Sequence, residues 1–114
     1  MHKIDTETRC EVGKKMFNAL SCGGGKEAYH ETGYNRFPVS QFLLPFNQTA
    51  HLCRMEYLPP FVIHETYTMT KEQLKNHGEQ YANLLTALVN DEITAEQYQK
   101  IEYLNELSPA LVTN

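Results

Sequence analysis

The chain has 114 residues, of which 41% are hydrophobic and 21% are charged, and its formal net charge is −4 at pH 7. This composition excludes a disordered chain, and the length suits a single domain, 1–114, whose core needs neither a metal nor a disulfide. The apolar runs are too short for a membrane span, and the charged N-terminal segment predicts no export signal, so we expect a cytoplasmic protein.

The N-terminal segment predicts a helix over residues 5–21. A threonine or an aspartate can cap its start, and apolar residues follow at helical spacing. The triple glycine, Gly23-Gly24-Gly25, ends it, because glycine suits the left-handed backbone that often follows a helix. We predict a hinge here and not a phosphate-binding loop, since Leu20 and Glu27 stand where that motif needs glycine and Ser or Thr.

The middle of the chain, residues 38–69, predicts two or three strands in a small antiparallel sheet. Residues 61–69 alternate in polarity and are rich in β-branched and aromatic side chains, which is typical of a strand. Residues 48–58 also alternate, but their apolar positions recur at helical spacing as well, so we favour a strand and leave a helix open. Residues 39–44, between two prolines, can add a third strand.

The last third predicts an antiparallel helical hairpin over residues 71–107. Two capping boxes mark the starts of its helices, Thr70 with Gln73 and Thr94 with Gln97. The short connection between the helices forces them to lie antiparallel. The predicted fold class is therefore α+β, with an N-terminal helix, the small antiparallel sheet and this hairpin.

Within the hairpin lies the sequence Leu-Thr-Ala-Leu-Val-Asn-Asp-Glu-Ile-Thr-Ala-Glu-Gln-Tyr, which begins at Leu85. It resembles the short C-terminal helical-hairpin domain called SHOCT, whose pattern has a leucine-rich helix, a turn, an Ile-Thr pair, acidic residues and an aromatic residue. The resemblance implies an interaction or oligomerisation element that has no chemistry of its own.

Candidates for chemistry are few. His51, Cys53 and His64 are weak candidates for a zinc site, because neighbouring strands could bring their side chains to one face. No closely spaced cysteine pair supports that site, so we predict no metal and no cofactor. A thiol enzyme that uses Cys22 and His30 is opposed by the predicted helix, whose C-terminal dipole disfavours a thiolate. We therefore predict no catalytic residue.

Two surfaces are candidates for binding a protein partner. The first is the polar side of the hairpin, because residues 71–114 hold three basic and seven acidic residues and so carry the whole net charge. Tyr103 should face solvent there, since it lies two residues, or about 200° of helix, after a core position. The second is the loop 26–37, whose composition is typical of adaptable binding loops. The candidate contact residues are Glu96, Tyr103 and Glu106 on the hairpin, and Tyr29, Tyr34 and Arg36 in the loop.

These features predict a small non-enzymatic cytosolic interaction protein that binds and regulates or inhibits a larger partner. Phages and mobile elements carry such inhibitors of nucleic-acid-binding machines. The sequence is also compatible with a homodimer, and it has no basic excess that would favour nucleic acid. The alternative is a nucleic-acid-binding module that uses the Tyr29–Phe37 loop, and the third hypothesis is a metal-dependent or thiol enzyme.

Overall fold

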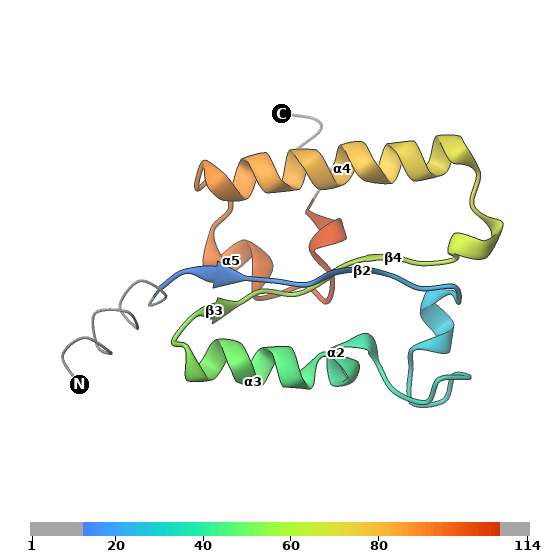
Figure 1. The fold of residues 1–114 in the computed structure, drawn as a ribbon, viewed down its shortest axis with the longest axis horizontal. Coiled ribbons are helices and arrows are strands. Elements are labelled where there is room, and N and C mark those ends of the chain that lie inside the picture. Colours follow the sequence, from blue (N-terminus) through green and yellow to red (C-terminus); the bar gives the residue numbers. More distant parts are fainter. Residues whose placement is uncertain (1–12, 108–114) are drawn as a thin grey trace.

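The computed structural model describes residues 13–107 (Figure 1). In chain order its elements are β1 (Lys15–Met16), β2 (Ala19–Ser21), the 3₁₀ turn η1 (Lys26–Ala28), α2 (Val39–Phe42), α3 (Leu44–Leu52), β3 (Glu56–Tyr57), β4 (Phe61–Ile63), the 3₁₀ turn η2 (Thr66–Thr68), α4 (Lys71–Val89), α5 (Ala95–Tyr98) and the 3₁₀ turn η3 (Leu104–Glu106).

The strands form a narrow parallel ribbon. β1 pairs with β3 and β2 pairs with β4, both in parallel. Met16 lies opposite Tyr57, whereas Ala19 lies opposite Phe61, so the second strand contains one extra residue between the two pairings. The extra residue falls beside Pro59-Pro60, which have no N–H groups to donate and therefore belong at such a bulge.

The prediction of an antiparallel sheet is wrong, because the connection between the paired strands is helical. Residues 39–44, the optional third strand, form α2 and the start of α3, and the first part of 48–58, for which a strand is favoured, lies in α3. A helical crossover carries the chain back to the end of the sheet at which the first strand began, so the next strand runs parallel to the first. The helical alternative for residues 48–52 is the correct one, and only Glu56–Tyr57 of that segment is a strand.

The predicted N-terminal helix is also wrong where the structure describes it. Residues 15–21 form β1 and β2, and residues 5–12 lie outside the described range. In β2 only Leu20 is partly buried, and a strand this short has too few apolar residues for its periodicity to be distinguished from that of a helix. In the segment 61–69 the strand prediction is correct only for β4. The strand β4 ends at Ile63, because Glu65, two residues later, has a left-handed backbone conformation with φ of 60°.

The C-terminal third begins as predicted and then departs from a hairpin. α4 starts at the Thr70 capping box, in which the Gln73 N–H donates to the threonine hydroxyl at 3.1 Å. α5 is only four residues long, so the predicted helix 95–107 is wrong beyond Tyr98. The chain instead turns to β4, where the N–H of Leu104 donates to the carbonyl oxygen of Pro60 at 2.8 Å. Bonding to this strand edge takes the place of a continued helix.

Helices cover both faces of the ribbon (Figure 1). α4 packs on one face, where Phe61 and Leu84 lie in one buried cluster, and α2 packs on the other, where Val39 and Val62 lie in a second cluster. This layering is that of an α/β protein with a parallel sheet. No helix between residues 13 and 107 is long and apolar enough to cross a membrane.

Candidate functional site

The candidate site lies where β2 and β4 end. In a parallel sheet the carboxyl ends of the strands meet at one edge, and ligands bind in the loops there. The loop that leaves β2 is Ser21–Gly25. It is fixed to the end of β4 by two backbone hydrogen bonds, from Cys22 to Ile63 at 2.8 Å and from Glu65 to Gly24 at 3.0 Å. The triple glycine is therefore the end of a strand and not the end of a helix.

The glycines of this loop leave backbone donors available. No residue between 13 and 107 accepts a hydrogen bond from the N–H groups of Gly23 or Gly24. A Cβ atom on Gly23 would overlap the ring of Tyr67, whereas one on Gly24 would meet only ordinary contact, 3.4 Å from the Cβ of Ala28. The loop therefore presents bare backbone, which a flat ligand can approach closely.

Beside the loop lies a cluster of titratable side chains. The ring centroids of Tyr29 and His64 are 6.0 Å apart, and those of His64 and Tyr103 are 5.4 Å apart. The ammonium of Lys26 lies 5.5 Å from the centre of the Tyr103 ring, within the range of a cation–π contact. Cys22, at the end of β2, is buried and has a free thiol.

The environment keeps the two phenols and the imidazole of this cluster uncharged near neutral pH. Hydrogen bonding to the Cys22 thiol raises the pKa of Tyr29, and burial adds to that shift. Burial raises the pKa of Tyr103 to about 12, and the negative charge of Glu102 acts in the same direction. Burial lowers the pKa of His64, helped by the positive charge of Lys26. Both phenols therefore keep their protons at pH 7, and the imidazole is neutral.

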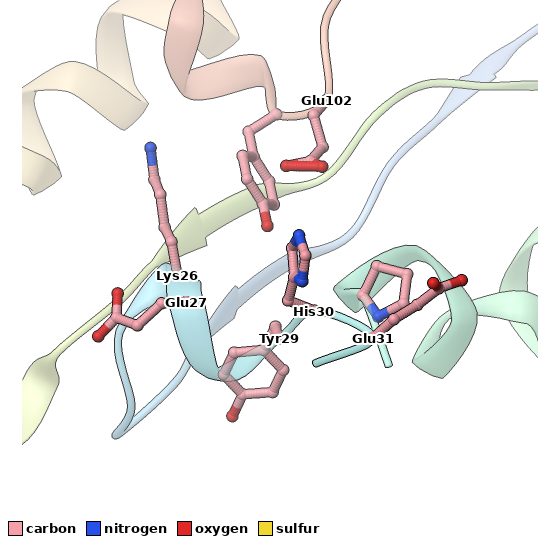
Figure 2. A pocket seen from close by; sticks show the side chains of 8 residues that line it. Lys26, Glu27, Tyr29, His30, Glu31 and Glu102 are labelled. Carbon is pink, nitrogen blue, oxygen red and sulfur yellow. The ribbon is translucent and has the colours of Figure 1, made fainter. Parts of the chain in front are cut away.

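A pocket of about 430 Å³ opens between the loop after η1 and the C-terminal segment (Figure 2). Tyr29, Pro38 and Tyr103 give it apolar walls, while Lys26 and Glu102 bring opposite charges to its rim. The pocket has the size of a small-ligand site.

The structure brings only some of the predicted contact residues together. Tyr29 and Tyr103 meet in the pocket, but Tyr103 is only 6% exposed, so the prediction that it faces solvent is wrong. The reason is that residue 103 follows the end of α5 and packs against the sheet. Glu96, Glu106, Tyr34 and Arg36 are exposed, and their role in binding stays a prediction.

The weak metal candidates are not assembled into a site. His51 lies in α3, Cys53 follows its last residue and His64 follows β4. Between residues 13 and 107 no group of three or more His, Cys, Asp or Glu side chains could hold a metal ion. The sequence did carry a signal for the Ser21–Gly25 site, namely an apolar run that leads directly into glycines, but it was assigned to a helix and its stop.

Comparisons with known proteins agree with the geometry. A family model described as having a flavodoxin-like fold matches residues 3–85. The KefG ancillary protein of the glutathione-regulated potassium-efflux system of Erwinia tasmaniensis is 33% identical over 73 residues, which are 64% of this chain and 40% of that protein. The uncharacterized NAD(P)H oxidoreductase YdeQ of Bacillus subtilis is 30% identical over 89 residues, 77% of this chain and 45% of that protein.

A solved structure is similar as well. General stress protein 14 of Treponema denticola, in complex with FMN, has 31% sequence identity and a TM-score of 0.62, and the match covers 68% of this chain and 44% of that chain. This chain thus spans less than half the length of each of these relatives. The matches overturn the SHOCT resemblance, because they describe a flavodoxin-like fold that begins near the N-terminus.

The comparisons also correct the predicted function. The matching family has a flavodoxin-like fold and one relative is named an NAD(P)H oxidoreductase, so the prediction of a non-enzymatic inhibitor from a phage or mobile element is wrong. The prediction that the chain acts mainly by occupying the surface of a larger partner is wrong for the same reason.

Proposed function

The chain belongs to the family of proteins with a flavodoxin-like fold, and from this premise we propose that it carries the flavin-contacting loop of an FMN-dependent NAD(P)H oxidoreductase. One observation carries the proposal. The loop Ser21–Gly25 stands at the carboxyl ends of two parallel strands with two backbone N–H groups that have no acceptor among the described residues. Relatives that are named for FMN and for NAD(P)H support this assignment.

The residues present fit the flavin. Its ring system is planar and carries carbonyl oxygens and ring nitrogens that accept hydrogen bonds, and the N–H groups of Gly23 and Gly24 are donors. The lack of a side chain at Gly24 lets the ring approach the backbone. When bound, FMN supplies the capacity to accept a hydride from NAD(P)H and to pass it to a substrate.

The neighbouring side chains would hold protons beside the loop. The raised pKa of Tyr29 keeps its hydroxyl protonated at neutral pH, so the phenol can donate a hydrogen bond to an oxygen or nitrogen on a substrate. The thiol of Cys22, a buried residue of the same loop, is the neighbour that contributes most to this raised pKa. A carbonyl-bearing acceptor such as a quinone suits such a donor.

The proposal is tested at Gly24. We expect Gly24→Val to fold normally, because an added Cβ atom meets only ordinary contact, but to lower the affinity for FMN by roughly tenfold or more, since the side chain would cover backbone that the ring would need to approach. Quenching of flavin fluorescence on titration with the protein measures this affinity. Gly78→Ala in α4 is the matched control, since its Cβ atom meets nothing within 4 Å and it lies outside the loop. Equal affinity in both variants would refute the assignment of the loop.

We also propose a cytoplasmic location. Within the described part of the chain the two cysteines, Cys22 and Cys53, are free thiols, as expected in a reducing compartment that supplies NAD(P)H. Fractionation of the source cells, with immunodetection of the chain, tests this location. Recovery in an exported fraction would contradict it.

A further inference from the structure

The pocket beside η1 is lined by two opposite charges that do not neutralise each other. The ammonium of Lys26 comes from η1 and the carboxylate of Glu102 comes from the segment after α5 (Figure 2). Both residues are exposed. Among residues 13–107, no carboxylate forms an ion pair with Lys26 and no basic side chain forms one with Glu102. Both charges are therefore available to a ligand.

A buried tyrosine determines where these two charges lie. The ring of Tyr103 is fixed edge-on against the imidazole of His64, and the ammonium of Lys26 lies 5.5 Å from the centre of that ring. Glu102 precedes the tyrosine in the chain. The N–H groups of Glu102 and Tyr103 donate to the carboxylate of Glu106 at 3.1 and 3.0 Å, which holds the backbone there. The two charges are thus positioned around one fixed ring.

The side of the pocket formed by η1 is fixed as well. The N–H of Ala28 donates to the carbonyl oxygen of Gly25, and that of Tyr29 donates to the carbonyl oxygen of Lys26, both at 3.1 Å. The ring of Tyr29 meets the ring of Phe42 edge-on, with centroids 6.1 Å apart. A pocket whose walls are already held in this way loses little conformational freedom when a ligand binds.

The space between the charges suits an apolar group. Tyr29, Pro38 and Tyr103 form its walls, and a volume of about 430 Å³ has room for one amino acid. An aromatic ring can meet the tyrosine rings in an offset or edge-on arrangement. The lining also contains Glu27 and Glu31, so it carries more negative than positive charge and attracts the ammonium end of a ligand most strongly.

We propose that this pocket binds a free α-amino acid with an aromatic side chain. The ligand's carboxylate contacts Lys26, its ammonium group contacts Glu102, and its side chain lies between the walls of Tyr29 and Tyr103. Such a ligand has no quinone-like carbonyl group, so it is distinct from the acceptor of the proposed reaction. The inference therefore goes beyond the proposed function and does not depend on the binding of FMN.

The test is a titration of the ¹⁵N-labelled 114-residue chain with L-phenylalanine, without FMN and at about pH 7, where both charged groups of the ligand are ionised. We expect a dissociation constant of roughly 0.1–1 mM, with the largest shifts at the amides of Lys26, Glu102 and Tyr103. Two analogues each lack one charge. Phenethylamine, without the carboxylate, should bind roughly fivefold more weakly, and hydrocinnamate, without the ammonium group, roughly tenfold more weakly.

Variants of the two charged residues assign each contact. Lys26→Gln should weaken the binding of L-phenylalanine by roughly fivefold or more but should not weaken that of phenethylamine, which has no carboxylate. Glu102→Gln should weaken both of these ligands but not hydrocinnamate. Lys75→Gln and Glu79→Gln, at exposed positions of α4, are the matched controls. They change the net charge by the same amounts and should leave all three affinities unchanged.

Clear results would overturn the proposal. One is the absence of shifts at the amides of Lys26 and Glu102 at about 10 mM L-phenylalanine. Another is equal affinity for phenethylamine and L-phenylalanine in the parent chain, which would mean that the pocket takes a simple cation. Equal effects of Lys26→Gln and Lys75→Gln would exclude the contact with the carboxylate. Failure of FMN binding changes none of these readouts, because the titrations contain no FMN.

Discussion

Asn105 shows at the level of one residue how the C-terminal segment is held. Its amide group bonds to both backbone groups of Val62, as a neighbouring strand would. We predict that Asn105→Ala lowers the free energy of unfolding by about 1–3 kcal/mol, because it leaves a half-buried donor and acceptor without partners. Urea denaturation measures this change. Asn76→Ala, an exposed position on α4, should change it by less than about 0.5 kcal/mol.

Tyr103 is the residue for which the helical interpretation and the structure differ most. It is buried, and its ring packs edge-on against the imidazole of His64. We predict that Tyr103→Ala lowers the free energy of unfolding by about 3–5 kcal/mol, as expected for truncation of a buried aromatic. Thermal and urea melts test this. A melting temperature equal to that of the parent would restore the solvent-facing interpretation.

Tyr98 links stability to pH. Burial raises its pKa to about 12, and its hydrogen bond to the Glu56 carboxylate contributes to the shift. The unfolded phenol has a pKa near 10, so the folded state binds the proton more tightly. The stabilisation is therefore complete below about pH 10 and is lost as the pH rises from about 10 to 12. We predict that the stability of Tyr98→Phe depends less on pH than that of the parent over this range, as measured by urea denaturation. Parallel pH profiles would contradict it.

At the level of elements, the sequence predicted the starts of α4 and α5, and among the strands it predicted β4 and the short β3 but not β1 and β2. A capping box is local, since a threonine and a glutamine three residues later make their contacts without help from the rest of the fold, and α4 begins where its box predicts. β1 and β2 lacked such a local signal. Met16 and Leu20 sit at helical spacing in a segment that pairs with a strand some forty positions away, and only that pairing decides its conformation.

The capping box of α4 can be tested by itself. We predict that Thr70→Ala lowers the free energy of unfolding by about 0.5–2 kcal/mol, because the Gln73 N–H loses its acceptor. Thr68→Ala is the matched control, since Thr68 lies just outside the helix and its hydroxyl makes only a long contact of 3.4 Å. Equal losses in the two variants would show that the cap contributes nothing specific.

At the level of the whole molecule, the layered arrangement explains both what was found and what was missed. Helices on both faces of a parallel ribbon place the loop Ser21–Gly25 at the carboxyl edge, where α/β proteins bind their ligands (Figure 1). The sequence predicted a flexible glycine segment but not that it lies at the carboxyl ends of parallel strands, because that position depends on the direction of the strands. The parallel direction of the strands depends in turn on the helical crossover through α2 and α3. These two helices bury few side chains, so their helical pattern in the sequence is weak.

The central claim is that FMN binds at the Ser21–Gly25 loop, and the most direct measurement is a ¹⁵N–¹H NMR titration of the chain with FMN. We predict that the amide resonances of Gly23 and Gly24 shift most, since their N–H groups gain acceptors, while those of α4 around Gly78 stay in place. Weak binding is still visible in such a titration. Shifts confined to other segments, or no shift of the two glycine amides at saturating FMN, would contradict the binding of FMN at the Ser21–Gly25 loop.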